Sequence, residues 1–453
     1  MPAYPRLLFT GAQPDSGKTD ITCAFLQAAV RRGLHPDAFS CGAQAGSSLY
    51  HLQAAGVKSR CLDHFLMQTE TIQSLLFADA AATDLAVVEG TEGLFDGSAG
   101  TDLSSSWDLC QSTGTPAVLI LRPQQALLTL AAQVKGLLQF RRESGVRALL
   151  LSGCTAAQYQ AAAPLLEQET GLPCVGYLPA MPDCSLQNFP MRPVLSAAET
   201  ADLHSRLDRL ACQLERTVNV ALLLQIAKSA TALEPAPFAR QPVTHEGPRI
   251  AVASDNAFCR VCTEDRELFE QLGAELLLFS PLGDAVLPPC EGLFLGGGTP
   301  EQFADGLSRN ISMRESIRRA VLDGMPTLAE DGGFLYLGQS MENTEGLSRP
   351  MAGVLPGRAF RTVRPRGGCT RLTVWQDNFL CPKGTTLRAY TAAGPDTDAR
   401  GADLLFQTEQ EEKWTCGFAH GSLFASFASL YFLSEPTLAA RFVLAAAKRR
   451  RKH

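Results

Sequence analysis

The chain has 453 residues, of which 45% are hydrophobic and 19% charged, and its net charge is −6. This length exceeds what one hydrophobic core supports, so we expect two or three globular domains. The negative charge argues against non-specific nucleic-acid binding, and the lack of an 18-residue apolar run argues against a membrane-spanning helix. The fourteen cysteines show no regular spacing, and no secretion signal precedes them, so we expect reduced thiols in a cytoplasmic protein.

A phosphate-binding loop is predicted from Gly11 to Thr19, between an apolar run and a helix-like pattern. Gly11 and Gly17 would let backbone N–H groups approach the phosphates of ATP at a helix N-terminus. Lys18 would reach the outer phosphates, and the Thr19 hydroxyl would bind Mg²⁺. Asp20 would repel phosphate and weaken the binding. Five residues separate the glycines, where the common motif has four, so a loop with a chance Lys-Thr pair is the alternative.

A second part of the nucleotide site is predicted at Glu89, on which the apolar run 85–88 ends. A carboxylate at a strand tip beside a P-loop can bind Mg²⁺ or its waters, whereas a solvated strand-terminal acid is the alternative. Further apolar runs at 117–121 and 148–151, with a helical stretch between them, predict a buried parallel sheet. We expect this P-loop domain to span residues 1–226.

A segment rich in Ala, Pro, Thr and Ser at 227–247 is predicted to be a linker. A second α/β domain is predicted over 248–446, and the basic residues 447–453 are expected to form a solvated tail. Within the second domain, the segment 326–334 has the pattern of a strand, a tight turn and a helix start. This is the geometry of a nucleophile elbow, and Asp331 stands at its apex.

Together these motifs resemble the cobyrinate a,c-diamide synthase family over nearly the whole chain. The spacing of the phosphate loop is similar to that of the family's nucleotide domain and of the related dethiobiotin synthetase. Other stretches resemble the family's acidic strand-end motif and its flavodoxin-like class I glutamine amidotransferase domain, namely 88–97, 257–259, 279–282, 295–301, 353–358 and 425–426. The resemblance implies an enzyme that phosphorylates two carboxylates of a corrin precursor with ATP. Each is then substituted with ammonia released from glutamine in the second domain.

The second domain departs from the family pattern at its catalytic residues. Asp331 stands where the family has a cysteine, and Ser429 where it has a histidine. Gly297 and Gly298 are the expected oxyanion-binding region. A carboxylate is a weaker nucleophile than a thiolate, and its charge would oppose the oxyanion that develops during amide hydrolysis. We therefore expect no glutaminase activity, and His420, nine residues before Ser429, is the only histidine nearby in the sequence.

The first domain departs as well, because Ser40, Gln44 and Ser47 stand where the family has a lysine and two aspartates. These charges are expected at the metal, the phosphates and the substrate. Three functions remain open. The chain is a corrin amide ligase that uses free ammonia, an ATP-binding pseudoenzyme that regulates or scaffolds a partner, or an amide ligase or kinase acting on another carboxylate.

All three functions use ATP with Mg²⁺. The other partners that we expect are a corrin or another tetrapyrrole carboxylate, and a second copy of the chain or an active paralogue. Neither a nucleic acid nor a membrane is expected as a partner.

Overall fold

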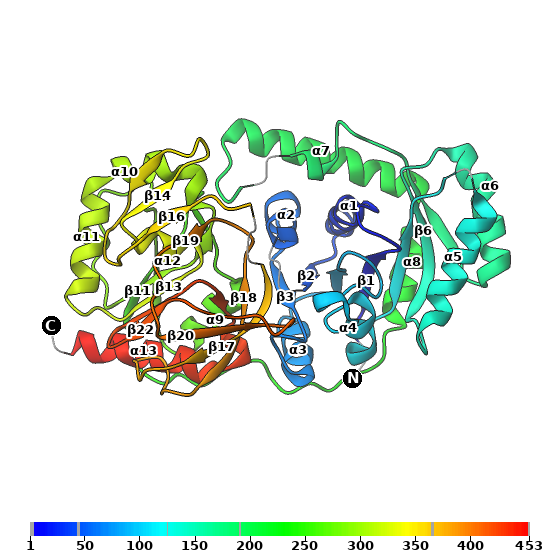
Figure 1. Ribbon diagram of the computed structural model, residues 1–453. Helices are drawn as coiled ribbons and strands as arrows, with labels where there is room; N and C mark the ends of the chain where they lie inside the picture. Colours follow the sequence, from blue (N-terminus) through cyan, green and yellow to red (C-terminus); the bar gives the residue numbers. More distant parts are fainter. Residues whose placement is uncertain (1–3, 43–45, 125, 190–191, 364–366, 452–453) are drawn as a thin grey trace. The chain divides into compact units, whose positions relative to one another are not determined.

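The computed structural model describes residues 4–42, 46–124, 126–189, 192–363 and 367–451 (Figure 1). The chain divides into two compact units, Met1–Phe238 and Ala239–His453. The division falls inside the segment 227–247, for which the sequence predicts a linker.

The first unit is built on a seven-stranded sheet in which all neighbouring strands pair in parallel, in the order β3-β2-β4-β1-β5-β6-β7. Its strands are β1 (Arg6–Gly11), β2 (Pro36–Cys41), β3 (Ser59–Leu62), β4 (Leu85–Glu89), β5 (Ala117–Leu121), β6 (Val146–Ser152) and β7 (Cys174–Leu178). The apolar runs identified in the sequence are strands β4, β5 and β6. They are almost entirely buried, as expected for a parallel sheet that is covered on both faces.

Helices cover this sheet, and α1, α2 and α7 pack against one another (Figure 1). The helices of the first unit are α1 (Lys18–Arg31), α2 (Gly46–Ala55), α3 (Thr69–Leu76), α4 (Ser106–Thr113), α5 (Leu127–Phe140), α6 (Ala156–Thr170), α7 (Ala197–Thr217) and α8 (Val220–Lys228), with short 3₁₀ turns η1 (Ser98–Gly100) and η2 (Leu186–Asn188). In α7, buried leucines recur every three or four residues and form one apolar stripe that faces α1.

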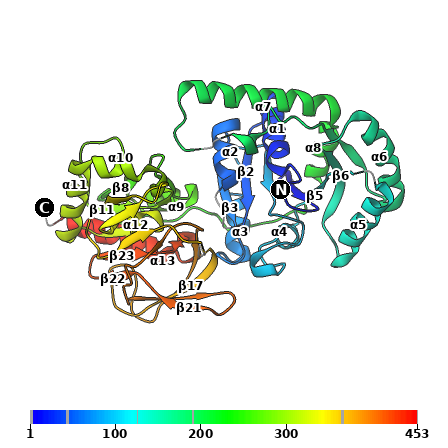
Figure 2. The same cartoon turned by 45° about the horizontal axis from the view of Figure 1, so that its top comes forward.

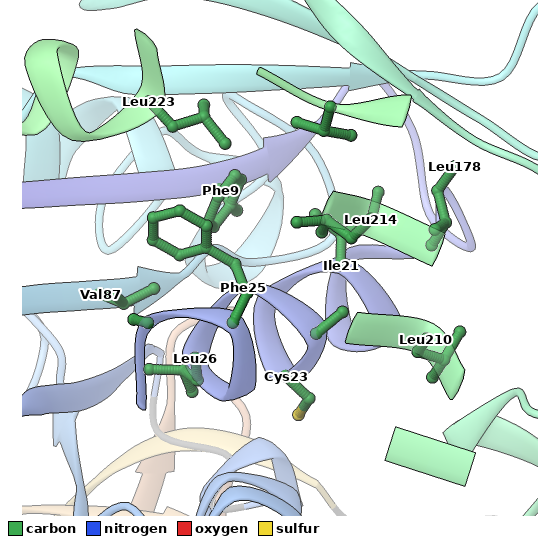
Figure 3. Packing of buried hydrophobic residues seen from close by; sticks show 14 of the residues in the cluster. Phe9, Ile21, Cys23, Phe25, Leu26, Val87, Leu178, Leu210, Leu214 and Leu223 are labelled. Atoms are coloured by element: carbon green, nitrogen blue, oxygen red, sulfur yellow. The ribbon is translucent and has the colours of Figure 1, made fainter. Parts of the chain in front are cut away.

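The core of the first unit lies between β1, α1, α7 and α8 (Figure 3). Phe9 of β1 and Phe25 of α1 meet edge to face, with ring centroids 5.2 Å apart. Leu210 and Leu214 of α7 and Leu223 of α8 are buried in the same cluster. This packing fixes the start of α1 beside the end of β1, and the predicted phosphate loop joins these two points.

The second unit contains a six-stranded sheet in the order β10-β8-β11-β13-β23-β22, parallel except for the edge pair β22–β23. Its strands are β8 (Arg249–Ala253), β10 (Glu275–Phe279), β11 (Gly292–Leu295), β13 (Thr327–Glu330), β22 (Phe418–His420) and β23 (Leu423–Ser426). A further strand pair joins β9 (Phe258–Arg260) to β12 (Gly297–Gly298) in antiparallel orientation. This is the α/β architecture that the sequence predicts for the second domain.

Two smaller sheets extend the second unit, in the orders β15-β14-β16-β19 and β21-β20-β17-β18-β24. Their strands are β14 (Ser340–Glu342), β15 (Ser348–Pro350), β16 (Arg358–Phe360), β17 (Gly368–Val374), β18 (Thr386–Thr391), β19 (Asp396–Thr397), β20 (Leu404–Thr408), β21 (Lys413–Thr415) and β24 (Ser429–Leu430).

The helices of the second unit are α9 (Thr263–Gln271), α10 (Ala304–Arg309), α11 (Ile311–Leu322), α12 (Gly332–Leu337) and α13 (Pro436–Arg450), with 3₁₀ turns η3 (Pro300–Phe303) and η4 (Phe432–Ser434). Helices α10 and α11 lie side by side, and α13 packs against β8, β11 and α9 (Figure 2). Among the described residues, no helix is both long enough and apolar enough to cross a bilayer.

The sequence predicts a solvated tail at 447–453, and in the structure the part as far as Arg450 is helical, with Lys448 and Arg450 exposed. Helix α13 continues to Arg450, because Phe442, Val443 and Ala447 keep its apolar face buried through the last turns. The Arg450 guanidinium also donates to the carbonyl oxygen of Gly247. As far as Arg450, the basic residues are therefore the end of a packed helix.

Three buried acids hold the segment that follows β23. The Leu430 N–H donates to Glu330 Oε1 over 2.9 Å, and the Phe432 N–H donates to Asp265 Oδ1 over 3.0 Å. The Tyr431 hydroxyl donates to Glu264 Oε1 over 2.5 Å. Burial raises the pKa of both Asp265 and Glu330 well above the ordinary range, and neighbouring acids raise it further. The fold therefore favours the protonated forms of these two side chains.

We expect Asp265→Asn to stabilise the chain relative to wild type as the pH rises. Since the native pKa of Asp265 is raised above its unfolded value of about 4, its stabilising contribution is complete below that value and is lost as the pH rises through the native pKa. Asparagine keeps an acceptor for the Phe432 N–H and does not ionise. In urea titrations, the difference in unfolding free energy between variant and wild type should grow as the pH rises above about 4.

Glu291→Gln is the matched control with the opposite sign. Hydrogen bonds from Arg249 lower the pKa of Glu291 although burial opposes this shift, so its contribution is present at neutral pH and is lost in acid. If the unfolding free energies of wild type and Asp265→Asn change in parallel with pH, the prediction is wrong.

Candidate functional site

The phosphate loop begins where β1 ends and finishes at the N-cap of α1. A Cβ on Gly11 would lie 2.3 Å from Ser16 Oγ, so this turn requires glycine. Gly17, the N-cap of α1, has a φ of 87°, which also favours glycine. A glycine N-cap carries no side chain to bind the N–H groups of the first helical turn. The loop thus presents the free helix N-terminus that an anion site needs.

The Lys18 side chain lies over this loop. Its ammonium donates to the Glu92 carbonyl oxygen over 2.8 Å. Burial lowers the pKa of Lys18, and the nearby acids Glu89, Glu92, Asp15 and Asp96 oppose that shift. A cation held in partly desolvated surroundings interacts more strongly with a phosphate oxygen than one in bulk water. The geometry is therefore that of a lysine able to exchange a carbonyl partner for a phosphate.

The side chains of Thr19, in the first turn of α1, and Glu89, at the end of β4, are in contact. The Thr19 hydroxyl donates to Glu89 Oε1 over 2.6 Å. Parallel pairing of β1 with β4 places Phe9 opposite Glu89, so the loop after β1 lies beside the Glu89 carboxylate. A hydroxyl and a carboxylate are the hard oxygen ligands that suit Mg²⁺, so these two residues fit a magnesium ion bound with a nucleotide.

A buried histidine that the sequence analysis missed also contacts Glu89. His51 of α2 is fully buried, and its Nε2 lies 2.9 Å from Glu89 Oε2. Its Nδ1 lies 2.9 Å from Ser59 Oγ on β3. Little in the sequence indicates this contact, because His51 lies in a polar stretch with no recognisable metal or catalytic spacing.

Asp20, which the sequence predicts to repel phosphate, lies in the first turn of α1 and has a partner of its own. Its Oδ1 accepts the backbone N–H of Leu186, in the 3₁₀ turn η2, over 2.8 Å. Burial raises the pKa of Asp20, and the hydrogen bond from Leu186 opposes that shift. The effect of Asp20 on phosphate binding stays a prediction.

The structure describes Ser40 and Ser47, two of the three positions at which the resemblance implies charged residues. Ser40 lies next to Glu89 in the β2–β4 register, and among the described residues its buried hydroxyl has no hydrogen-bond partner. Ser47 lies in α2. Gln44 falls outside the described residues. At Ser40, the chain leaves an unpaired hydroxyl where the resemblance implies a lysine.

The predicted elbow is present in the second unit. Asp331 lies between β13 and α12 with φ 49° and ψ −115°, a conformation that non-glycine residues rarely adopt. Gly333 follows closely, and a Cβ there would lie 2.1 Å from the Leu295 carbonyl oxygen. The strand, turn and short helix therefore have the elbow geometry even though the apex residue is an aspartate.

The Asp331 carboxylate lies against the expected oxyanion region. Its Oδ2 accepts the Gly298 N–H over 3.4 Å and lies 3.6 Å from Arg260 Nη2. A Cβ on Gly297 would lie 2.7 Å from the same oxygen. Burial raises the pKa of Asp331, and Arg260 opposes that shift. A carboxylate of the protein thus takes the backbone donor that would serve a developing oxyanion, and Arg260 is a contact that sequence reasoning missed.

The histidine nearest to Ser429 in the sequence, His420, does not lie at this elbow. The Asp331 N–H donates to the Ser426 carbonyl oxygen, and Ser429 follows three residues later on β24, paired with Tyr390. His420 pairs with Leu423, at the start of β23, and its Nδ1 lies 2.8 Å from Asp403 Oδ2. It therefore lies toward the strand end opposite to the elbow.

Comparison with known proteins accounts for both halves of the chain. Residues 249–436 match the model of the CobB/CobQ-like glutamine amidotransferase domain. The cobyrinate a,c-diamide synthase of Dehalococcoides mccartyi (strain ATCC BAA-2266 / KCTC 15142 / 195) is 30% identical over 97% of this chain and 98% of its own length. That of Thermoplasma volcanium is 30% identical over 97% of this chain and 96% of its own length.

The chain belongs to the cobyrinate a,c-diamide synthase family. Within this family framework, the P-loop residues Lys18 and Thr19 retain the expected types, and Thr19 contacts Glu89. The amidotransferase unit has an elbow backbone with Asp331 at its apex, where the resemblance to the family implies a cysteine, and Ser429 where it implies a histidine.

We expect Arg260→Gln to destabilise the second unit by about 1–3 kcal/mol. The substitution leaves the buried Asp331 carboxylate without its cation, although the partial exposure of Arg260 reduces the cost below that of a fully buried pair. In an Asp331→Asn background the same substitution should cost at least about 1 kcal/mol less. Urea unfolding of the four proteins measures this coupling, and additive effects would show that the pair does not interact.

Proposed function

We propose that the chain is an ATP- and Mg²⁺-dependent amide ligase that acts on carboxylates of a corrin precursor and takes ammonia from solution. The observation that carries this proposal is the Thr19–Glu89 hydrogen bond beneath an open P-loop. Family membership over almost the full chain supports the choice of reaction and substrate, since the relatives are cobyrinate a,c-diamide synthases.

In this mechanism the chain's own residues bind and orient the nucleotide. Backbone N–H groups of the loop, beginning at Gly11, and the N-terminus of α1 bind the phosphates, and Lys18 neutralises the outer ones. Thr19 and Glu89 would hold Mg²⁺, which supplies charge neutralisation when it is bound. The substrate carboxylate attacks the terminal phosphorus of ATP and ADP leaves, which gives an acyl phosphate. Ammonia then attacks the carbonyl carbon, loses a proton and displaces inorganic phosphate, which leaves the amide.

The residues at the elbow are the reason for proposing that ammonia comes from solution and not from glutamine. Amide hydrolysis by this fold requires a thiolate, a histidine that moves its proton and donors for an oxyanion. Here Asp331 replaces the thiol, Ser429 replaces the histidine, and Asp331 itself accepts the Gly298 N–H. A carboxylate at that position also repels the negative charge of a tetrahedral intermediate. The second unit is therefore proposed to have no glutaminase activity.

The unpartnered hydroxyl of Ser40 favours a second candidate, an ATP-binding pseudoenzyme that regulates or scaffolds a partner, such as an active paralogue. Charge that develops during phosphoryl transfer needs nearby cations, and a serine beside Glu89 cannot supply the lysine of the family pattern. The same observation is compatible with a ligase or kinase whose pocket accepts a different carboxylate. Turnover assays separate these candidates.

We expect corrin amidation with ammonium chloride, ATP and Mg²⁺, and none when glutamine replaces ammonium. Lys18→Ala should lower ATP affinity by about 10- to 100-fold, because it removes a charge-assisted contact worth about 1.5–3 kcal/mol. Lys135→Ala is the matched control, since Lys135 pairs with Glu169 on the helical surface. Calorimetry and mass spectrometry of the corrin product give the two readouts. ATP binding without turnover on any corrin would favour the pseudoenzyme.

We also expect that one substitution does not restore the glutaminase. Asp331→Cys should react with an electrophilic glutamine analogue, because Arg260 favours the thiolate. It should not release ammonia from glutamine, since Ser429 cannot move a proton. Turnover is expected only when Ser429→His is added. Ammonia release by the unmodified protein, abolished by Asp331→Ala, would show instead that the aspartate is a working nucleophile.

A further inference from the structure

A chain of three contacts runs from the phosphate loop into the interior of the first unit. Glu89 Oε1 accepts the Thr19 hydroxyl, and Glu89 Oε2 lies 2.9 Å from His51 Nε2. His51 Nδ1 then lies 2.9 Å from Ser59 Oγ. Beyond Thr19, these contacts involve Glu89 of β4, His51 of α2 and Ser59 of β3, and all three residues are buried.

The direction of these hydrogen bonds follows from the groups involved. A carboxylate oxygen only accepts, so the proton in the shared contact is on His51 Nε2. The hydroxyl of Thr19 donates to Glu89, which leaves the lone pairs of Thr19 Oγ1 directed elsewhere. A threonine in this state can bind a metal ion through its oxygen while Glu89 keeps its orientation.

Glu89 depends on His51 for its orientation, because the residue beside it in the sheet, Ser40, gives it no side-chain hydrogen bond. Ser40 neighbours Glu89 in the sheet, and among the described residues its hydroxyl makes no hydrogen bond. A fully buried imidazole bonded at both nitrogens has little freedom to turn, since rotation would leave polar atoms without partners. His51 therefore holds one oxygen of Glu89 in a fixed position.

We propose that His51 is a positioning residue for the Mg²⁺–nucleotide site, holding Glu89 so that its other oxygen receives the Thr19 hydroxyl and these two residues stay together where they would hold the metal. This inference rests on the proposed use of Mg²⁺ and ATP. A positioning residue differs from a packing residue in one measurable way. Loss of the His51 contact should weaken ATP binding only when Mg²⁺ is present. Partners that orient a metal-binding carboxylate typically change metal affinity by about 10- to 100-fold when removed.

The test compares His51→Gln with His51→Asn. Glutamine can place its amide N–H near the position of Nε2 and keep the bond to Glu89, whereas asparagine reaches only the position of Nδ1, near Ser59. Calorimetry measures ATP binding once with Mg²⁺ and once with EDTA. We expect His51→Gln to bind Mg²⁺–ATP within about threefold of wild type and His51→Asn to bind it about 10- to 100-fold more weakly. ATP affinity in EDTA should be the same in all three proteins.

Ser59→Ala is the matched control, since it removes the partner of Nδ1 and leaves the bond to Glu89. Its Mg²⁺–ATP affinity should stay within about threefold of wild type, well short of the loss of about 10- to 100-fold expected when a positioning contact is removed. If both His51 variants bind Mg²⁺–ATP like wild type, or lose affinity equally in EDTA, the inference is wrong. If the wild-type protein binds no Mg²⁺–ATP, the proposed function fails, and this inference with it.

The wild-type protein gives a second readout that does not require a folded variant. The ¹⁵N resonance of His51 Nε2 should shift when Mg²⁺ is added to the ATP complex, and ATP with EDTA should not cause that shift. The absence of a Mg²⁺-specific shift would overturn the inference even if the variants proved unstable.

Discussion

The proposed nucleotide site depends on the adjacency of β1 and β4 in the first sheet. These strands are far apart in the chain, yet their parallel pairing brings the loop after β1 to the end of β4, where Thr19 donates to Glu89 over 2.6 Å. Because all neighbouring strands are parallel, the carboxyl ends of the strands lie along the same edge of the sheet. The core between β1, α1 and α7 makes this meeting rigid, so the site is set before any ligand binds.

The second unit has the backbone of a nucleophile elbow with an aspartate at its apex. Asp331 keeps the strained φ of an elbow, and such conformations cost about 1–3 kcal/mol unless their surroundings impose them. Here the surroundings are close-packed glycines and the buried acids Glu330 and Asp265, which hold the segment after β23. The same contacts that would position a thiol therefore position a carboxylate beside Arg260.

Local patterns in the sequence predicted the parts of the molecule that depend on neighbouring residues. The loop glycines, Lys18, the strand ending on Glu89 and the elbow at Asp331 each have a short motif that requires a particular backbone. His51 and Arg260 could not be found in this way, because their contacts join elements that only the fold brings together. The direction of the Asp20 side chain was also beyond the sequence, since it depends on an N–H group 166 residues away.

The aspartate at the elbow has a consequence for how such a ligase would obtain nitrogen. A glutamine-fed enzyme delivers ammonia inside the protein and follows the cell's glutamine supply. With Asp331 in place of a thiol, the proposed reaction would instead follow the concentration of dissolved, unprotonated ammonia. It would also be indifferent to oxidants and alkylating agents that inactivate elbow thiolates. The replacement thus exchanges dependence on an amino-acid donor for dependence on ambient ammonia and pH.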